Sequence, residues 1–135
     1  MSTVIRAEVS QNNKYYINKH RYYELKHYCM QYDLWKKELT MINVYPDLTL
    51  KSGSTGPSNP TQNIVERRER YTRKISMLDK VAKAVDPVIG PYVLEGIIRG
   101  LSYDTLNAQV DIPCCKDLYY TTYRKFFWVL DKVRR

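Results

Sequence analysis

The stretch from Gly100 to Leu130, GLSYDTLNAQVDIPCCKDLYYTTYRKFFWVL, decides the fold that we expect for this chain. Gly100 is suited to end a helix because glycine adopts the left-handed backbone at the least cost. Ser102 follows directly and can accept hydrogen bonds from the free amides of a new helix that starts at Tyr103. One helix is therefore predicted to stop almost where the next begins.

The new helix is short and is followed by a tight turn. Tyr103, Leu106 and Val110 are spaced by three and four residues, which forms one apolar stripe, and the stripe ends before residues 111–113. A proline follows Ile112 and disfavours the helical backbone there, so we expect Ile112 to be extended and buried between two helices. This pattern predicts a helix-turn-helix.

The last helix of the motif is predicted to run from Cys114 or Cys115 to the C-terminus and to be amphipathic. Its apolar face is expected to hold Tyr119, Tyr123, Phe126, Phe127, Leu130 and Val133. Its opposite face is expected to expose Lys116, Asp117, Tyr120, Thr121, Arg124 and Lys125. A recognition helix presents its N-terminal half to base edges in the major groove, so the exposed face indicates double-stranded DNA as a partner.

A family resemblance rests on the same residues. Gly100 to Tyr103, Leu106 and the pair Ile112-Pro113 resemble the two-helix promoter-reading motif of bacterial sigma factors and of the small sigma-like regulators of bacteriophages, such as the ArpU-like late-gene regulators. The chain is also similar to small prophage proteins. Asp111 stands where such motifs usually have glycine, and Asn107 where they usually have a small residue. The resemblance implies a phage-encoded, sequence-specific regulator of transcription.

The DNA hypothesis assigns contacts to individual side chains. Base edges are expected to be contacted by Lys116, Tyr120, Thr121 and Arg124. Backbone phosphates are expected to be contacted by Arg99, Tyr103, Lys125, Lys132, Arg134 and Arg135. The N-terminal helices would then form a homodimer or recruit the host RNA polymerase.

The net charge of +8 favours a polyanionic partner. Residues 101–135 hold six basic and four acidic side chains, so the motif itself is only mildly basic. Much of the phosphate contact would therefore come from other helices or from a second subunit.

Composition is typical of a soluble protein, with 135 residues, 44% hydrophobic and 27% charged. No apolar run reaches the roughly 20 residues of a membrane-spanning helix, and the N-terminus lacks the apolar core of a signal peptide. Three cysteines, two of them adjacent, suit reduced thiols. We therefore expect a cytoplasmic protein without membrane contact, and the resemblance to phage regulators implies the cytoplasm of a bacterial host cell.

The whole chain is predicted to be all-α, with about six helices in a single domain, residues 1–135. Its parts are a helical region at 1–44, a flexible loop at 45–60, a long helix and a central apolar helix at 61–100, and the helix-turn-helix with the terminal helix at 101–135.

Predicted helix starts and buried positions complete the pattern. Expected starts are an N-cap at Asn18, an N-cap at Asp33, Asn59-Pro60 and Asp86-Pro87. The first helix is expected to bury Tyr22, Leu25 and Cys29. The second is expected to carry the apolar residues Leu34, Trp35, Leu39 and Ile42.

Neither an enzyme nor a metal or cofactor site is expected. The chain has no glycine-rich phosphate loop and no nucleophile elbow. His20 and His27 are two helical turns apart, about 10 Å, which is too far for a shared metal ion without a further ligand. Adjacent Cys114 and Cys115 lack the spacer of a zinc knuckle.

Two alternatives remain open. A protein-interaction module would bind and redirect a host protein through Trp35, Trp128 and the tyrosines, with the helix-turn-helix as scaffold. Tyr15 and Tyr16 are the best exposed contact candidates among the 13 tyrosines besides Tyr120. A terminase-like DNA-packaging subunit would share the motif but would assemble as a ring.

Overall fold

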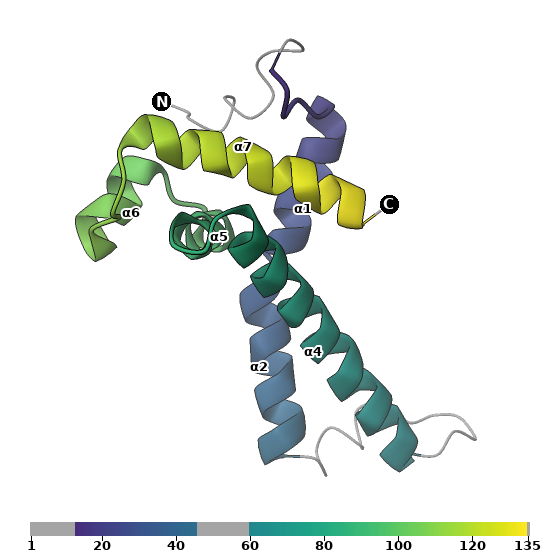
Figure 1. Cartoon of the computed structure of the whole chain (residues 1–135). Helices are drawn as coiled ribbons and strands as arrows, with labels where there is room; N and C mark the ends of the chain where they lie inside the picture. Colours follow the sequence, from purple (N-terminus) through teal and green to yellow (C-terminus); the bar gives the residue numbers. More distant parts are fainter. Residues whose placement is uncertain (1–12, 46–59, 135) are drawn as a thin grey trace. The chain divides into compact units, whose positions relative to one another are not determined.

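The computed structural model describes residues 13–45 and 60–134, and this part of the chain contains helices and no strands (Figure 1). The predicted all-α fold is confirmed. The six helices are α1 (Lys19–Cys29), α2 (Tyr32–Val44), α4 (Pro60–Val85), α5 (Ile89–Arg99), α6 (Tyr103–Val110) and α7 (Lys116–Val133). Residues 46–59, which hold most of the predicted loop and Asn59, lie outside the described residues.

The helices belong to two compact units. The first unit combines residues 13–31 with residues 78–134, so it holds α1, the last part of α4, and α5 to α7. The second unit, within residues 32–77, holds α2 and the remainder of α4. The single domain expected from the sequence stays a prediction.

The central helix of the first unit is α7, which packs against α1, α5 and α6. Five of its six predicted apolar positions are buried, and Val133 is the exception, because 52% of it is exposed. Tyr120 and Thr122 are buried as well, so the prediction that Tyr120 faces solvent is wrong. A helix with three helical neighbours buries a wider face than the narrow stripe of an ordinary surface helix.

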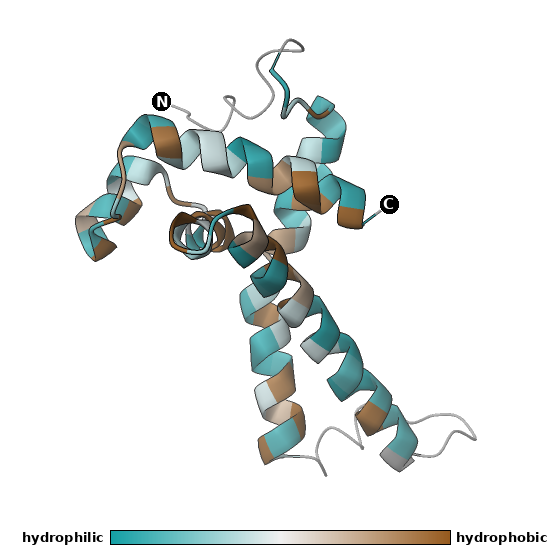
Figure 2. Ribbon diagram, in the orientation of Figure 1, coloured by the Kyte–Doolittle hydropathy of each residue, from teal (hydrophilic) through white to brown (hydrophobic). Residues whose placement is uncertain are grey.

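The predicted central helix α5 is largely apolar, as Figure 2 shows by its brown colour. It begins at Ile89 rather than at Pro87, and Val88 is its N-cap residue. The Asp86 Oδ1 accepts the amides of Val88 at 2.9 Å and Ile89 at 2.8 Å. Backbone amides at a helix start lack partners within the helix, and this carboxylate supplies one.

Three predicted caps are confirmed. Asn18 Oδ1 accepts the amide of His20 at 2.8 Å, and Ser102 Oγ accepts the amide of Thr105 at 3.2 Å. Gly100 ends α5 in the left-handed conformation, with φ of 67°. The predicted N-cap at Asp33 is wrong, since α2 begins one residue earlier and Asp33 lies in its first turn.

The sequence departs from the sigma-like motif at Asp111 and Asn107, and both residues contribute to the turn between α6 and α7. Asp111 is left-handed, with φ of 55°, where such motifs use glycine. The Asn107 side chain accepts the amide of Ile112 at 2.8 Å, a contact that a small residue would not provide. Ile112 is buried as predicted, and α7 then starts at Lys116.

Replacing Asp111 with glycine is expected to raise the free energy of unfolding by up to about 1 kcal/mol, because the left-handed backbone is unstrained for glycine. Asp111→Val should lower it by about 1–2 kcal/mol. Urea denaturation followed by circular dichroism measures both. Ala108→Gly in the exposed face of α6 is the control, with an expected loss of about 1 kcal/mol. A loss of stability in Asp111→Gly would contradict the left-handed turn.

In the second unit, α2 and α4 run in opposite directions. Lys74 of α4 lies over the ring of Trp35, 5.3 Å from its centroid, and Arg68 Nε donates to Asn43 Oδ1 at 3.0 Å. Trp35 and Ile42 are buried, whereas 55% of Leu34 is exposed. Leu34 lies on a different side of the helix from the buried pair.

Candidate nucleic-acid interface

One face of α7 is left uncovered by its neighbours in the first unit. We call this face the α7 ridge; all of its residues are exposed or half-buried. They are Asp117, Leu118, Thr121, Arg124, Lys125, Trp128 and Lys132. Their spacing of three and four residues keeps them on one side of the helix. At 1.5 Å per residue the ridge is about 22 Å long.

Two of the four predicted base-contacting residues lie together on the ridge. Arg124 Nη2 donates to Thr121 Oγ1 at 3.4 Å, and Thr121 Oγ1 donates to the carbonyl of Asp117 at 2.9 Å. Lys116 lies to the side of the ridge, where its ammonium pairs with the Asp104 carboxylate at 3.2 Å. Thr121 and Arg124 therefore form the middle of the ridge.

The sequence predicts that Tyr120 contacts a base, and the structure contradicts this prediction. Only 5% of it is exposed, and its hydroxyl accepts the backbone amide of Tyr103 at 3.0 Å. That amide is at the start of α6 and would otherwise lack a helical partner. The hydroxyl thus joins α7 to α6, and a base contact by Tyr120 is excluded while this bond is intact.

Tyr103 is a second correction, since it is also buried. Its hydroxyl donates to the carbonyl of Cys114 at 2.6 Å, and its ring packs edge-on against Tyr119 with centroids 5.2 Å apart. These contacts fix α6 to the start of α7. Tyr103 is therefore part of the scaffold of the motif and does not reach phosphate.

The predicted phosphate-contacting cations are divided between the ridge and its surroundings. Lys125 and Lys132 lie on the ridge. Arg134 is exposed, with its guanidinium over Tyr28 at 3.5 Å from the ring centroid. Arg99, on α5, donates to Glu95 at 3.0 Å and to Gln109 at 2.6 Å. Arg135 lies outside the described residues.

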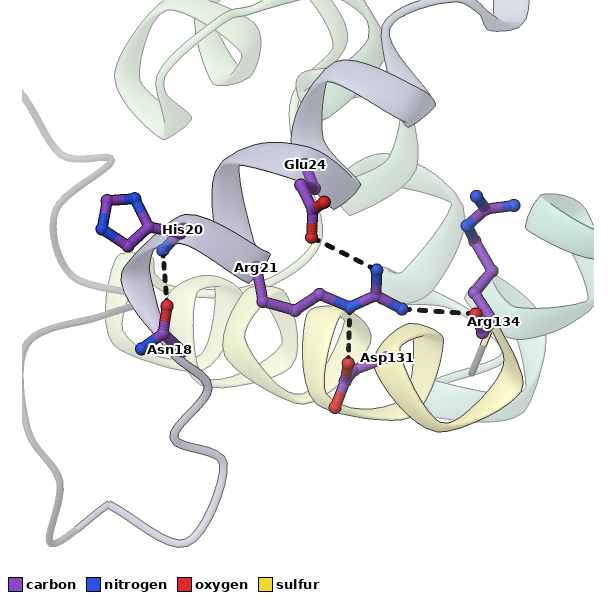
Figure 3. Close-up of polar contacts among 6 residues, drawn as sticks. All are labelled: Asn18, His20, Arg21, Glu24, Asp131 and Arg134. Carbon is purple, nitrogen blue, oxygen red and sulfur yellow. Dashed lines mark hydrogen bonds and ion pairs between the residues drawn. The ribbon is translucent and has the colours of Figure 1, made fainter.

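A polar network holds α1 against the end of α7 (Figure 3). Arg21 donates from Nε to Asp131 at 2.7 Å, from Nη1 to Glu24 at 3.4 Å and from Nη2 to the carbonyl of Arg134 at 3.3 Å. The hydrogen bond with Asp131 is the main cause that raises the pKa of Arg21. The positive charge of Arg21 balances the negative charge of Asp131. Asp131 therefore offsets little of the positive charge on the neighbouring ridge.

Charge is unevenly distributed along the ridge. Asp117 is in the first turn of α7, whereas Arg124, Lys125 and Lys132 are in its middle and C-terminal half. Asp104 and Asp111 are exposed near the start of the helix. Phosphate would therefore be attracted to the C-terminal half and repelled near Asp117.

An aromatic cluster with two lysines lies at the C-terminal half of the ridge, and the sequence does not reveal it as a group. The Tyr15 and Trp128 rings meet with centroids 5.5 Å apart. The Lys14 ammonium lies 5.1 Å from the Tyr15 centroid, and the Lys132 ammonium 4.2 Å from the Trp128 centroid. We call these four residues the Trp128 cluster. Its two halves are over a hundred positions apart, so no local spacing connects them.

Other kinds of site are not found in the described part of the chain. Residues 13–45 and 60–134 contain no group of three or more His, Cys, Asp or Glu side chains arranged to hold a metal ion. Within the same ranges, no helix combines the length and apolar character needed to cross a bilayer. Cys29 is buried, and Cys115 is exposed at the start of α7.

Comparison with models of known protein families, with curated proteins and with solved structures gives no match for this chain. The resemblance to sigma-like phage regulators therefore stays a prediction from the sequence.

Proposed function

We propose that this chain binds double-stranded DNA through the α7 ridge and regulates transcription. The observation that supports this most is the position of the ridge: the second helix of a helix-turn-helix leaves one face open, and that face bears three cations against one acid. In helix-turn-helix proteins the second helix enters the major groove.

Thr121 and Arg124 are the side chains that we assign to base edges. An arginine can donate two hydrogen bonds to the O6 and N7 atoms of guanine, and a threonine can bond to several bases. Lys116 can join them, because its pair with Asp104 is between exposed side chains, and such pairs stabilise by at most about 1 kcal/mol. Tyr120 and Tyr103 are not assigned to DNA, because both are buried.

Lys125, Lys132 and Arg134 are assigned to backbone phosphates, with Arg99 as a further contact. The first three belong to the C-terminal half of α7 or follow it directly, away from Asp117. The net charge of +8 would add long-range attraction to DNA.

The finer parts of the proposal come from the sequence motif. They are a phage-encoded, sigma-like regulator that acts in the cytoplasm of a bacterial host as a homodimer, with a host protein such as RNA polymerase as a second partner.

Two substitutions on the ridge are expected to have different effects on duplex binding. Arg124→Ala should weaken binding to a selected site by about 1–3 kcal/mol and leave binding to random duplex nearly unchanged. Lys125→Ala should weaken binding to both and lower the salt dependence by about one phosphate contact. Selection from a random duplex pool, followed by gel-shift titration at two salt concentrations, measures both.

Lys83→Ala is the matched control, because Lys83 is an exposed lysine on α4 of the same unit. It should alter duplex binding less than Lys125→Ala does. Failure to enrich any duplex, or equal losses in all three variants, would contradict a role for the ridge.

A protein-interaction module is the second candidate. Trp35, one of the anchors that the sequence predicts for it, is buried, and the exposed apolar side chains of the second unit favour the module instead. Leu34, Met41, Val44 and Tyr45 are each 43–56% exposed, and Leu34, Met41 and Tyr45 share one side of α2 or its end. Exposed apolar groups gathered on one face are typical of protein-binding surfaces. Binding of a partner there should change little with added salt, whereas DNA binding should fall steeply.

A further inference from the structure

We propose that the Trp128 cluster binds an unpaired base of single-stranded DNA, with its lysines on the adjacent phosphates. The cluster combines two aromatic rings and two ammonium groups, which are the components of sequence-tolerant single-strand sites. This activity goes beyond duplex binding and depends on side chains other than Thr121 and Arg124.

The cluster is held in place before any ligand binds. Asn13 Oδ1 accepts the amide of Tyr15 at 2.8 Å, and the Asn13 carbonyl accepts the amide of Tyr16 at 3.0 Å. Ile17 is 5% exposed, so it anchors this segment in the core of the first unit. Tyr15 is thus positioned against Trp128, and little ordering remains for a ligand to bring about.

The lysines can move from the rings to phosphates at low cost. Lys14 and Lys132 are exposed, and each lies over one aromatic ring. Cation–π contacts at exposed sites are weak, so an arriving phosphate competes well for the ammonium groups. Tyr15 and Trp128 are both half-buried, and their rings then become available to a base.

The choice of an unpaired base follows from the rings. Bases inside a duplex are already stacked on both faces, so a protein ring can stack fully only on a base outside the helix. An acidic peptide would satisfy the lysines but would leave the rings without a partner. The nearest acid on α7, Asp131, is bound to Arg21 and would not repel the phosphates.

Tryptophan fluorescence can test this directly, because the chain has only two tryptophans. In a Trp35→Phe background of the full chain, all tryptophan emission comes from Trp128. Titration with an eight-nucleotide oligo(dT) should quench this emission. In the unaltered chain, Trp128→Leu should reduce the affinity for labelled oligo(dT), followed by anisotropy, by about tenfold or more. Lys132→Gln should reduce it several-fold at low salt and less at high salt.

Poly-glutamate and inorganic phosphate are the control probes, since they carry charge without bases. Equal quenching by poly-glutamate, absence of oligo(dT) binding, or unchanged affinity in a folded Trp128→Leu variant would each overturn the proposal. Arg124→Ala should leave oligo(dT) affinity within about twofold. Loss of duplex selection with oligo(dT) binding intact would contradict the proposed function alone, and the reverse result would contradict this inference alone.

Discussion

Gly90→Ala is expected to lower the free energy of unfolding by about 3 kcal/mol or more. A Cβ atom at Gly90 would overlap the backbone carbonyl of Ala82, where α5 passes the end of α4. The obstacle is backbone at the end of a helix, so no side chain can rotate to make room. The two helices would have to separate, which would expose neighbours such as Val93 and Leu78.

The direction of the change in stability distinguishes a crowded Gly90 from a glycine in a helix without close neighbours. In a helix that touches nothing, replacing glycine by alanine stabilises by about 1 kcal/mol, because alanine has the higher helix propensity. Ala84→Gly at an exposed position in the last turn of α4 is the matched control and should cost at most about 1 kcal/mol. Urea denaturation of both variants measures the effect. A gain of stability in Gly90→Ala would show that the close approach of α5 and α4 is absent.

Local features of this fold are those that the sequence predicts well. The caps at Asn18, Gly100 and Ser102 depend on one side chain or one backbone angle and on residues within three positions. Such interactions do not require knowledge of any other helix. The proline after Ile112 likewise restricts the backbone of Ile112 locally, whereas the burial of its side chain, which was also predicted, depends on the helices that enclose it.

Exposure could not be predicted in the same way, because it depends on how many helices surround a position. Tyr120 belongs to the polar-looking side of α7, yet α6 covers it and uses its hydroxyl. Val133 continues the apolar stripe beyond the helices that cover it, so it is exposed. The Trp128 cluster joins residues 14–15 to residues 128–132, and only the packing of the first unit brings these together.

Raising the pH from 9 to 12 is expected to unfold the protein through groups in its core. Burial raises the pKa of the Cys29 thiol to about 12, and burial also raises the pKa of Tyr119 and of Tyr123 above the usual value of a phenol. Between pH 9 and 12 the unfolded chain has lost the Cys29 proton, while the folded chain still holds it. Stability therefore falls with rising pH, by about 1.4 kcal/mol per pH unit for this one proton.

Cys29→Ala removes the thiol, so it should flatten the decline that begins near pH 9, although it also costs stability at neutral pH through lost packing. Cys115→Ala is the matched control, because its thiol is exposed in the folded chain and its loss leaves the core unchanged. Urea midpoints measured at pH 7, 9, 10 and 11 give the slopes. Parallel slopes for the unaltered chain and Cys29→Ala would contradict a contribution from the buried thiol.

Tyr119→Phe distinguishes the contribution of a buried phenol to the alkaline loss of stability from that of the Cys29 thiol. The Tyr119 hydroxyl is buried and has no hydrogen-bond partner among the described residues. An unpaired buried hydroxyl costs stability, so Tyr119→Phe should leave the neutral-pH stability unchanged or raise it by up to about 1 kcal/mol. Above pH 10 the variant should lose stability less steeply than the unaltered chain, because one buried phenol no longer resists ionisation. Tyr123→Phe should reduce the alkaline slope as well, but at neutral pH it removes the 2.8 Å hydrogen bond with Tyr22 and should cost about 1 kcal/mol.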